Sequence, residues 1–189
     1  MRKLALVAAL ALMAGGAQAA TLSVVGGQLM GASDVLVDGS LYDVQFLDGT
    51  CIALFNGCDD VSDFTFQTDG AASLASEALL DQVFLDGGAG LFDSEPDSTT
   101  GCTFSFVCSA ITPYTPGLDG LVQNGSVAVN FQSISGDDTE APSAWPASTD
   151  TTLQTDYVYA SWTPVPEPGT AILMGLGLLG LSASKRIEG

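Results

Sequence analysis

The sequence predicts an α+β or mainly β fold, in which a predominantly antiparallel sheet packs against one helix. Residues 35–46 carry a strong hairpin signal, and three further short runs have the period of half-buried strands. Only residues 69–88 combine helical spacing with helix end signals. We add an N-terminal signal helix and a C-terminal transmembrane helix, so that one folded domain remains between them.

The hairpin signal is centred on Asp38-Gly39, because this dipeptide readily takes the positive φ angles of a type I′ turn. Apolar residues alternate on both sides of it, and Tyr42, Val44 and Phe46 fall on one face of the second arm. We therefore expect two paired strands on either side of the turn.

Three other runs have the two-residue period of half-buried strands. Their apolar positions are Phe64 and Phe66; Val127, Val129 and Phe131; and Tyr157 and Tyr159, followed by Ser161 and Trp162. Between the last two runs, residues 136–150 are rich in Asp, Thr, Ser and Pro, so we expect a loop there.

The predicted helix places apolar and polar side chains on opposite faces. The apolar face has Ala71, Leu74, Ala75, Ala78, Leu79 and Phe84, and the polar face has Ser73, Glu77 and Asp81. We expect Asp69 to help cap the start of this helix and Gly87-Gly88 to end it.

The charge distribution disfavours several functions. The chain has a net charge of −18 and no His, and its basic residues are Arg2, Lys3, Lys185 and Arg186. The long interior therefore has no imidazole, no Lys nucleophile and no Arg to hold a phosphate, which disfavours most enzyme chemistries. Because its carboxylates repel nucleic acid and anionic lipids, we expect no nucleic-acid partner.

Residues 1–19 have the three parts of a secretory signal peptide. Two basic residues start it, a short apolar run follows, and Ala17-Gln18-Ala19 has the small-x-small form that signal peptidase reads. We expect the Sec translocon to export the chain and signal peptidase to cut it after Ala19. An acidic extracytoplasmic domain then occupies residues 20–162.

The other end carries a predicted transmembrane helix at residues 170–184, with a linker at 163–169 before it and a basic tail at 185–189 after it. By the positive-inside rule the tail stays in the cytoplasm, and the acidic domain lies across the membrane. The apolar core of this helix is about 20 Å long, against about 30 Å of hydrocarbon, so we expect a transient anchor.

Pro166-Glu167-Pro168, the apolar helix and the terminal basic residues together resemble a PEP-CTERM sorting signal. In that family an exosortase recognises the signal. Exosortase is a membrane-embedded cysteine protease-transpeptidase of Gram-negative bacteria that make extracellular polysaccharide. The resemblance implies exosortase as a partner, extracellular polysaccharide as a candidate partner, and a final location at the cell surface or outside the cell.

Residues 37–50 also resemble a segment, G-x-L-Y-D-V-x-F-x-D-G, that recurs in PEP-CTERM proteins. This second resemblance supports the sorting assignment. It supplies no catalytic residue, and we assign none.

The exported part contains four cysteines, and an oxidising compartment favours disulfides between them. They are Cys51, Cys58, Cys102 and Cys108. We favour the bridge between the first two, because Asn56-Gly57 provides a turn. The last two can bridge only if residues 103–107 form a loop, since a straight strand would hold them about 20 Å apart. We favour this local pair, but a cross-pairing with the first two stays open.

Carboxylates cluster at several places, and calcium prefers such oxygen ligands. We name Asp93, Glu95 and Asp97 as weak calcium candidates and expect no other cofactor. A zinc site is disfavoured, because the cysteines lack C-x-x-C spacing and the chain has no His.

These observations favour a non-enzymatic surface or extracellular-matrix protein with a structural, adhesive or binding role. Two alternatives stay open. A secreted glycan hydrolase would use two carboxylates about 5–10 Å apart in an open cleft. A calcium-dependent carbohydrate-binding module would retain glycans only when calcium is bound.

Overall fold

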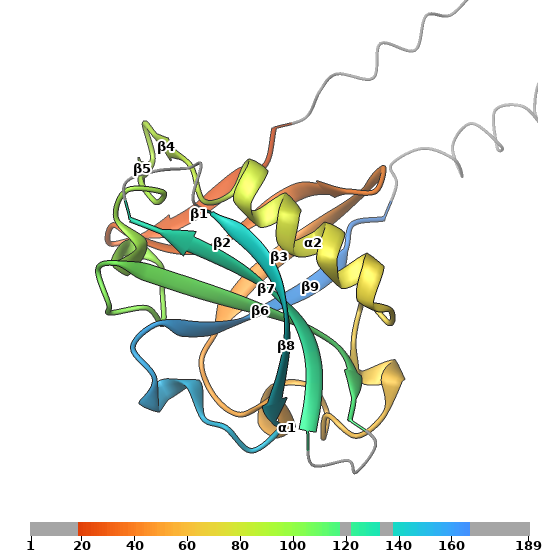
Figure 1. The fold of residues 1–189 in the computed structure, drawn as a ribbon. Helices are drawn as coiled ribbons and strands as arrows, with labels where there is room; N and C mark the ends of the chain where they lie inside the picture. Colours follow the sequence, from red (N-terminus) through yellow and green to blue (C-terminus); the bar gives the residue numbers. More distant parts are fainter. Residues whose placement is uncertain (1–18, 118–121, 133–137, 167–189) are drawn as a thin grey trace, which may run out of the picture.

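The computed structural model describes residues 19–117, 122–132 and 138–166 (Figure 1). The predicted signal helix, up to residue 18, and the predicted transmembrane helix at 170–184 lie outside these residues. Within the described residues, no helix is long and apolar enough to cross a membrane.

Most of the domain is one seven-stranded sheet with the order β1-β2-β3-β9-β6-β7-β8. Its strands are β1 (Thr21–Val25), β2 (Gln28–Val37), β3 (Ser40–Leu47), β6 (Val107–Pro116), β7 (Val122–Phe131), β8 (Thr139–Pro146) and β9 (Tyr157–Pro164). The other elements are α1 (Cys51–Leu54), α2 (Asp69–Gln82), the short strands β4 (Asp86–Gly87) and β5 (Gly90–Leu91), and 3₁₀ turns at Val61–Asp63, Pro96–Ser98 and Thr151–Leu153.

The expectation of a mainly β fold with one packed helix is confirmed, but the sheet is mixed. Every neighbouring pair of strands is antiparallel except β6 and β9, which run parallel. A parallel pair needs a long crossover connection. Here β7, β8 and the turn at Thr151–Leu153 supply it, since they lie between β6 and β9 in the chain.

The hairpin of β2 and β3 is confirmed, with Asp38 and Gly39 as its two-residue turn. Their φ angles are 46° and 81°, both in the left-handed region that a type I′ turn requires. Val37 pairs with Ser40 across this turn. On the second arm Val44 and Phe46 are buried and Tyr42 is half-buried, as their shared face predicts.

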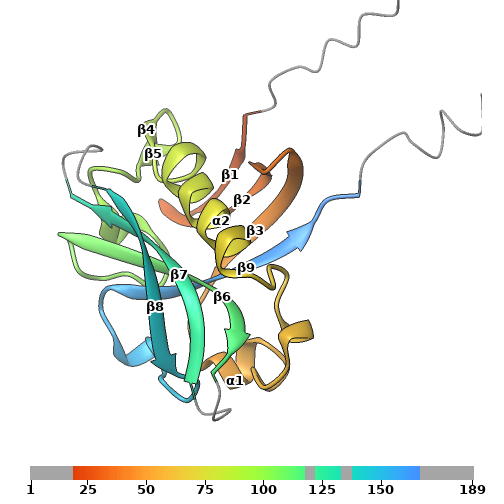
Figure 2. The ribbon, with the colours of Figure 1, turned by 45° about the vertical axis from the view of Figure 1, so that its right-hand side comes forward.

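The sheet curls around α2, and this curvature decides which side chains are buried. Figures 1 and 2 show the helix between two groups of strands, β1 to β3 on one side and β6 to β8 on the other. Accordingly, α2 contacts β2 as well as β6, β7 and β8. The largest apolar cluster lies between this inner face and the helix, and Phe46, Phe84 and Phe92 are its largest fully buried members.

The position of α2 is confirmed, but its cap and buried face differ from the prediction. Thr68, not Asp69, is the N-cap, and its hydroxyl accepts from the backbone N–H of Ala71. Leu74 is 43% exposed, whereas Ser76 is fully buried. Because the sheet wraps the helix closely, small residues fill the contact: Ala72, Ala75, Ser76 and Ala78. The helix ends at Gln82, well before Gly87-Gly88.

The opposite side of the sheet, which we call the outer face, carries a smaller cluster. Residues from the segment that contains α1 cover it there, and Cys51, Phe55 and Phe64 pack against Ile111 and Tyr159.

Two predictions of secondary structure were wrong. Phe64 and Phe66 lie outside the strands, because Asp60 and Asp63 form a capping box that closes a 3₁₀ turn just before them. Both rings are nevertheless buried, one in each apolar cluster. The loop expected at 136–150 contains β8, an edge strand whose position at the sheet margin tolerates its prolines.

Candidate functional site

A groove of 480 Å³ lies on the outer face, beside the part covered by α1. Its floor comes from β6 and β7, where Val107, Ser109, Val127 and Val129 line it. These positions share a face because Ser109 pairs with Val129, and partners in a ladder point to the same side.

Two aromatic side chains form one wall of this groove. Trp145 comes from β8 and Tyr157 from the first position of β9, and their ring centroids are 4.5 Å apart at an angle of 57°. Both rings are half-buried, so each keeps part of its surface open to solvent. We call this pair the aromatic corner.

One carboxylate stands next to the aromatic corner. Among the described residues that line the groove, Asp156 is the single charged one. Desolvation, followed by the negative charge of Asp156, raises the pKa of the Tyr157 hydroxyl. The field of this carboxylate therefore reaches the aromatic corner.

Exposed aromatic residues continue beyond the end of the groove. Phe131, which lines it, is 38% exposed, and Phe106 is 61% exposed. The carbonyl of Phe106 accepts from the backbone N–H of Gln132, which places the two phenylalanines at the same end. The ring of Phe104 lies 5.5 Å from that of Phe106.

A second hollow, of 380 Å³, lies between α2 and β8 and is lined mainly by carboxylates. Glu77 and Asp81 come from the helix, and Asp138 and Glu140 from the strand region. Two of them hold the fold: Glu140 accepts a 2.6 Å bond from the hydroxyl of Ser126, and Asp138 accepts a 2.8 Å bond from the backbone N–H of Phe131. We call this site the acidic hollow.

The weak calcium candidates are not brought together. Asp93 and Asp97 are half-buried and Glu95 is exposed, and among the described residues no three acidic or cysteine side chains form a group that could hold a metal ion. Asp93 instead faces Asp86. Desolvation and the charge of Asp86 raise the pKa of Asp93, whereas hydrogen bonds from Ser94 and Asp93 lower that of Asp86.

Both local disulfides are confirmed. Cys51 and Cys58 have Cα atoms 5.7 Å apart, and Cys102 and Cys108 have theirs 5.6 Å apart. The second bridge closes a loop of residues 103–106, because β6 already begins at Val107, and that loop presents the exposed pair of Phe104 and Phe106.

The C-terminal end of the fold lies closer to the Pro-Glu-Pro segment than the sequence suggests. Thr163 and Pro164, expected in the linker, belong to β9 and pair with β3. Beyond the strand, the backbone N–H of Val165 donates a 2.9 Å bond to the carbonyl of Leu41. Pro166 follows at once and is exposed.

A comparison with protein families identifies this end of the chain. The family described as the PEP-CTERM protein-sorting motif matches residues 164–186. The chain carries a PEP-CTERM sorting motif. No curated protein and no solved structure matches the chain at a significant level.

The PEP-CTERM motif implies exosortase as the sorting partner, and with it export and sorting at the membrane. Its first residue, Pro164, is the last residue of β9, so motif and domain overlap. Glu167 and Pro168 of the predicted sorting motif lie outside the described residues, as does Ala17 of the predicted cleavage site. Ala19, where cleavage is expected, is exposed one residue before Ala20 joins the edge of the core.

The sequence does not predict the groove, because Trp145 falls in the expected loop at 136–150 and Tyr157 in a strand whose aromatic side chains are expected in the core. One signal for β8 was present: Ala141, Ser143 and Trp145 alternate with prolines and other residues, as they would on the edge of a sheet.

Proposed function

We propose that the protein is an exported surface or extracellular-matrix protein of a Gram-negative bacterium, sorted by exosortase. Its acidic β domain then has a structural, adhesive or binding role without enzymatic activity. The observation that carries this proposal is the overlap of the sorting motif with β9, since the domain and its sorting signal form one continuous unit.

Two further features support this role. Both described ends of the chain leave the same side of the domain in Figures 1 and 2, as expected if both targeting segments meet one membrane. Two disulfides and a large buried core suit a domain that must persist outside the cell. Extracellular polysaccharide is a candidate partner at that location.

The absence of basic chemistry supports a non-enzymatic role. No Lys, Arg or His occurs between Leu4 and Ser184, so acid–base and nucleophilic chemistry there depends on carboxylates and hydroxyls. Among its described residues, the groove that contains the aromatic corner is lined by one carboxylate, Asp156, whereas glycoside hydrolysis ordinarily requires two.

The test is the fate of the chain in its native host. Replacing Pro166 and Glu167 by Ala should leave full-length protein in the inner membrane, while the wild type reaches the surface or medium without its C-terminal anchor. The intact mass of the protein in each fraction shows whether the C-terminal anchor is still present. Glu188→Ala is a matched control, because it also removes one carboxylate but lies outside the motif at 164–186. Equal release of the motif variant and the wild type would refute the proposal.

The acidic hollow favours a second candidate, a glycan hydrolase, because four carboxylates line it. Glu77 is the residue to replace, since it is exposed on α2. If this candidate holds, the purified protein releases reducing ends from the host polysaccharide and Glu77→Gln abolishes the release. Equal release by Glu77→Gln and the wild type would reject Glu77 as part of a carboxylate pair.

A further inference from the structure

The aromatic groove has the shape and lining of a site for a small ligand group. Its volume of 480 Å³ lies within the range of ligand pockets, which are mostly apolar with a few polar groups. Val127 and Val129 give it an apolar floor, to which Ser109 adds a hydroxyl. Ser143 also lines it, and the aromatic corner forms one wall with Asp156 beside it.

The aromatic corner and Asp156 favour the same kind of group, a cation. The face of a Trp or Tyr ring attracts an ammonium placed within about 6 Å of its centre, and Trp does so best. Asp156 adds a full negative charge beside these rings. An anion would meet the carboxylate without any basic side chain to offset it.

The charge of the whole chain acts in the same direction. Its net charge is −18, and no Lys or Arg lies between Leu4 and Ser184. Such a field raises the local concentration of cations and lowers that of anions. A neutral ligand would gain nothing from this field. Charge complementarity therefore selects a cation among the ligands that the groove is large enough to hold.

We propose that the groove binds an organic cation, whose alkylammonium head lies against Trp145 and Tyr157 beside Asp156 and whose methylene stem lies on Val127 and Val129. Two sources share this chemistry: a free alkylamine, and the lysine side chain of a basic peptide segment. The inference rests on the proposed binding role of the domain and names the ligand class of its groove.

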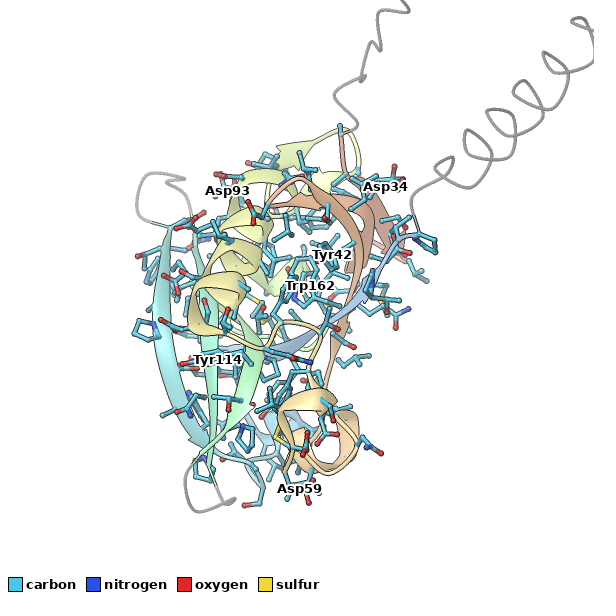
Figure 3. The ribbon with its side chains drawn as sticks, turned by 90° about the vertical axis from the view of Figure 1, so that its right-hand side faces the viewer. Asp34, Tyr42, Asp59, Asp93, Tyr114 and Trp162 are labelled. Atoms are coloured by element: carbon cyan, nitrogen blue, oxygen red, sulfur yellow. A yellow bond between two sulfur atoms is a disulfide. The ribbon has the colours of Figure 1, made fainter. Side chains whose placement is uncertain are left out.

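The two tryptophans of the chain provide an internal control for a binding experiment. Trp145 lines the groove, whereas Trp162 is buried on the inner face, where its indole donates to Thr112. Figure 3 shows Trp162 beside Tyr42, between α2 and the sheet, and their ring centroids are 6.3 Å apart. A ligand in the groove must therefore move the indole N–H signal of Trp145 and leave that of Trp162 in place.

The experiment titrates n-butylammonium chloride, and separately tetralysine, into the full-length chain in a polyoxyethylene detergent, which brings neither ammonium nor sugar. Sodium chloride holds the ionic strength constant. We expect a saturable shift of the Trp145 signal with both probes if a lysine side chain fits, and with butylammonium alone if the site takes free amines only. Sodium butyrate and methyl glucoside should give no saturable shift.

Variants distinguish binding in the groove from the general attraction of cations by the negative charge of the chain. Trp145→Ala and Tyr157→Leu should each weaken butylammonium binding about tenfold. Binding to Trp145→Ala is measured by calorimetry, because this variant lacks the indole observed by NMR. Binding to Tyr157→Leu is measured by NMR. Asp156→Asn should weaken it about fivefold, whereas Asp59→Asn, an equal loss of charge at an exposed position, should change it less than twofold. Thermal melts check that each variant is folded.

Three results would overturn the inference: no saturable shift with either cation, saturation by methyl glucoside instead, or equal weakening by Asp156→Asn and Asp59→Asn. None of them depends on sorting. A protein that is processed normally at Pro166-Glu167 but does not bind cations would refute the groove proposal and leave the proposed function standing.

Discussion

The backbone N–H of Val165 donates a 2.9 Å hydrogen bond to the carbonyl oxygen of Leu41, one step beyond the pairing of Pro164 with Tyr42. The residue that precedes Pro166 is thereby bound to β3, the second strand of the β2–β3 hairpin. Contact with the sheet therefore extends at least to Val165, which lies inside the sorting motif that starts at Pro164.

This relationship predicts where the chain can be shortened. A mature domain ending at Val165 should unfold at the same urea concentration as one ending at Pro168. A domain ending at Trp162 loses the pairing of Thr163 and Pro164 with β3, and its free energy of unfolding should fall by about 1–3 kcal/mol. Urea denaturation of the three proteins checks this, and equal midpoints would show that the last three residues do not hold the sheet.

Tyr159 and Gln123 form a buried polar pair whose loss should be costly. The amide nitrogen of Gln123 donates a 2.8 Å bond to the Tyr159 hydroxyl, and within the described residues the amide oxygen has no partner. Tyr159→Phe leaves that buried donor unsatisfied, so we expect a loss of about 1–3 kcal/mol in unfolding free energy at pH 7. Tyr42→Phe, which removes a half-buried hydroxyl, is the comparison.

The same tyrosine predicts an alkaline pH dependence. Burial raises the pKa of Tyr159 to about 12, above its ordinary value of about 10. A raised folded-state pKa gives stability that is present below the unfolded value and lost as the pH rises toward 12. Between pH 9 and pH 11.5 the melting temperature should therefore fall less in Tyr159→Phe than in the wild type. An equal fall in both proteins would contradict the raised pKa of Tyr159.

Asp93 is a carboxyl group that destabilises the fold when it is ionised. Desolvation and the nearby charge of Asp86 raise the pKa of Asp93. The fold therefore loses stability as the pH rises through the folded-state pKa and Asp93 ionises. Asp93→Asn should raise the melting temperature at pH 7 and have little effect at pH 2.5, where the wild-type group is protonated. Glu95→Gln, an equal charge change at an exposed site, is the control.

The features that the sequence predicted correctly are those set by local chemistry. Asp38-Gly39 forces its turn whatever lies around it, and two cysteines six or seven positions apart can meet across a short loop. The sorting motif is read as a linear segment, so it too needs no knowledge of the fold.

The features that were missed depend on contacts between distant segments. Ser76 is buried and Leu74 exposed because the sheet curls around α2, which the helical period alone does not reveal. Trp145 and Tyr157 form a corner because β8 and β9 lie on either side of β6 and β7. The groove thus arises from strand order, which depends on the parallel pairing of β6 with β9.

The disulfides should be fully formed in the native compartment. Alkylation without reduction should find no free thiol, as the two bridges imply. Replacing both members of either pair by Ser should lower the free energy of unfolding by about 2–3 kcal/mol, because each loop then regains its entropy in the unfolded chain. Alkylatable thiols in protein from the native host would contradict the first statement, and unchanged urea midpoints would contradict the second.

Salt should stabilise the domain, because its carboxylates repel one another with no basic side chain between Leu4 and Ser184 to offset them. Raising sodium chloride from 0.01 to 1 M shortens the screening length from about 30 to about 3 Å, so the melting temperature should rise by several degrees.

Calcium chloride at matched ionic strength separates screening from binding. A specific site would saturate below about 1 mM, whereas screening continues to increase with concentration. If calcium acts by screening alone, it should raise the melting temperature as sodium chloride does. A melting temperature unchanged by both would show that the repulsion is too weak to matter, and early saturation by calcium alone would reveal a site that the described residues do not form by themselves.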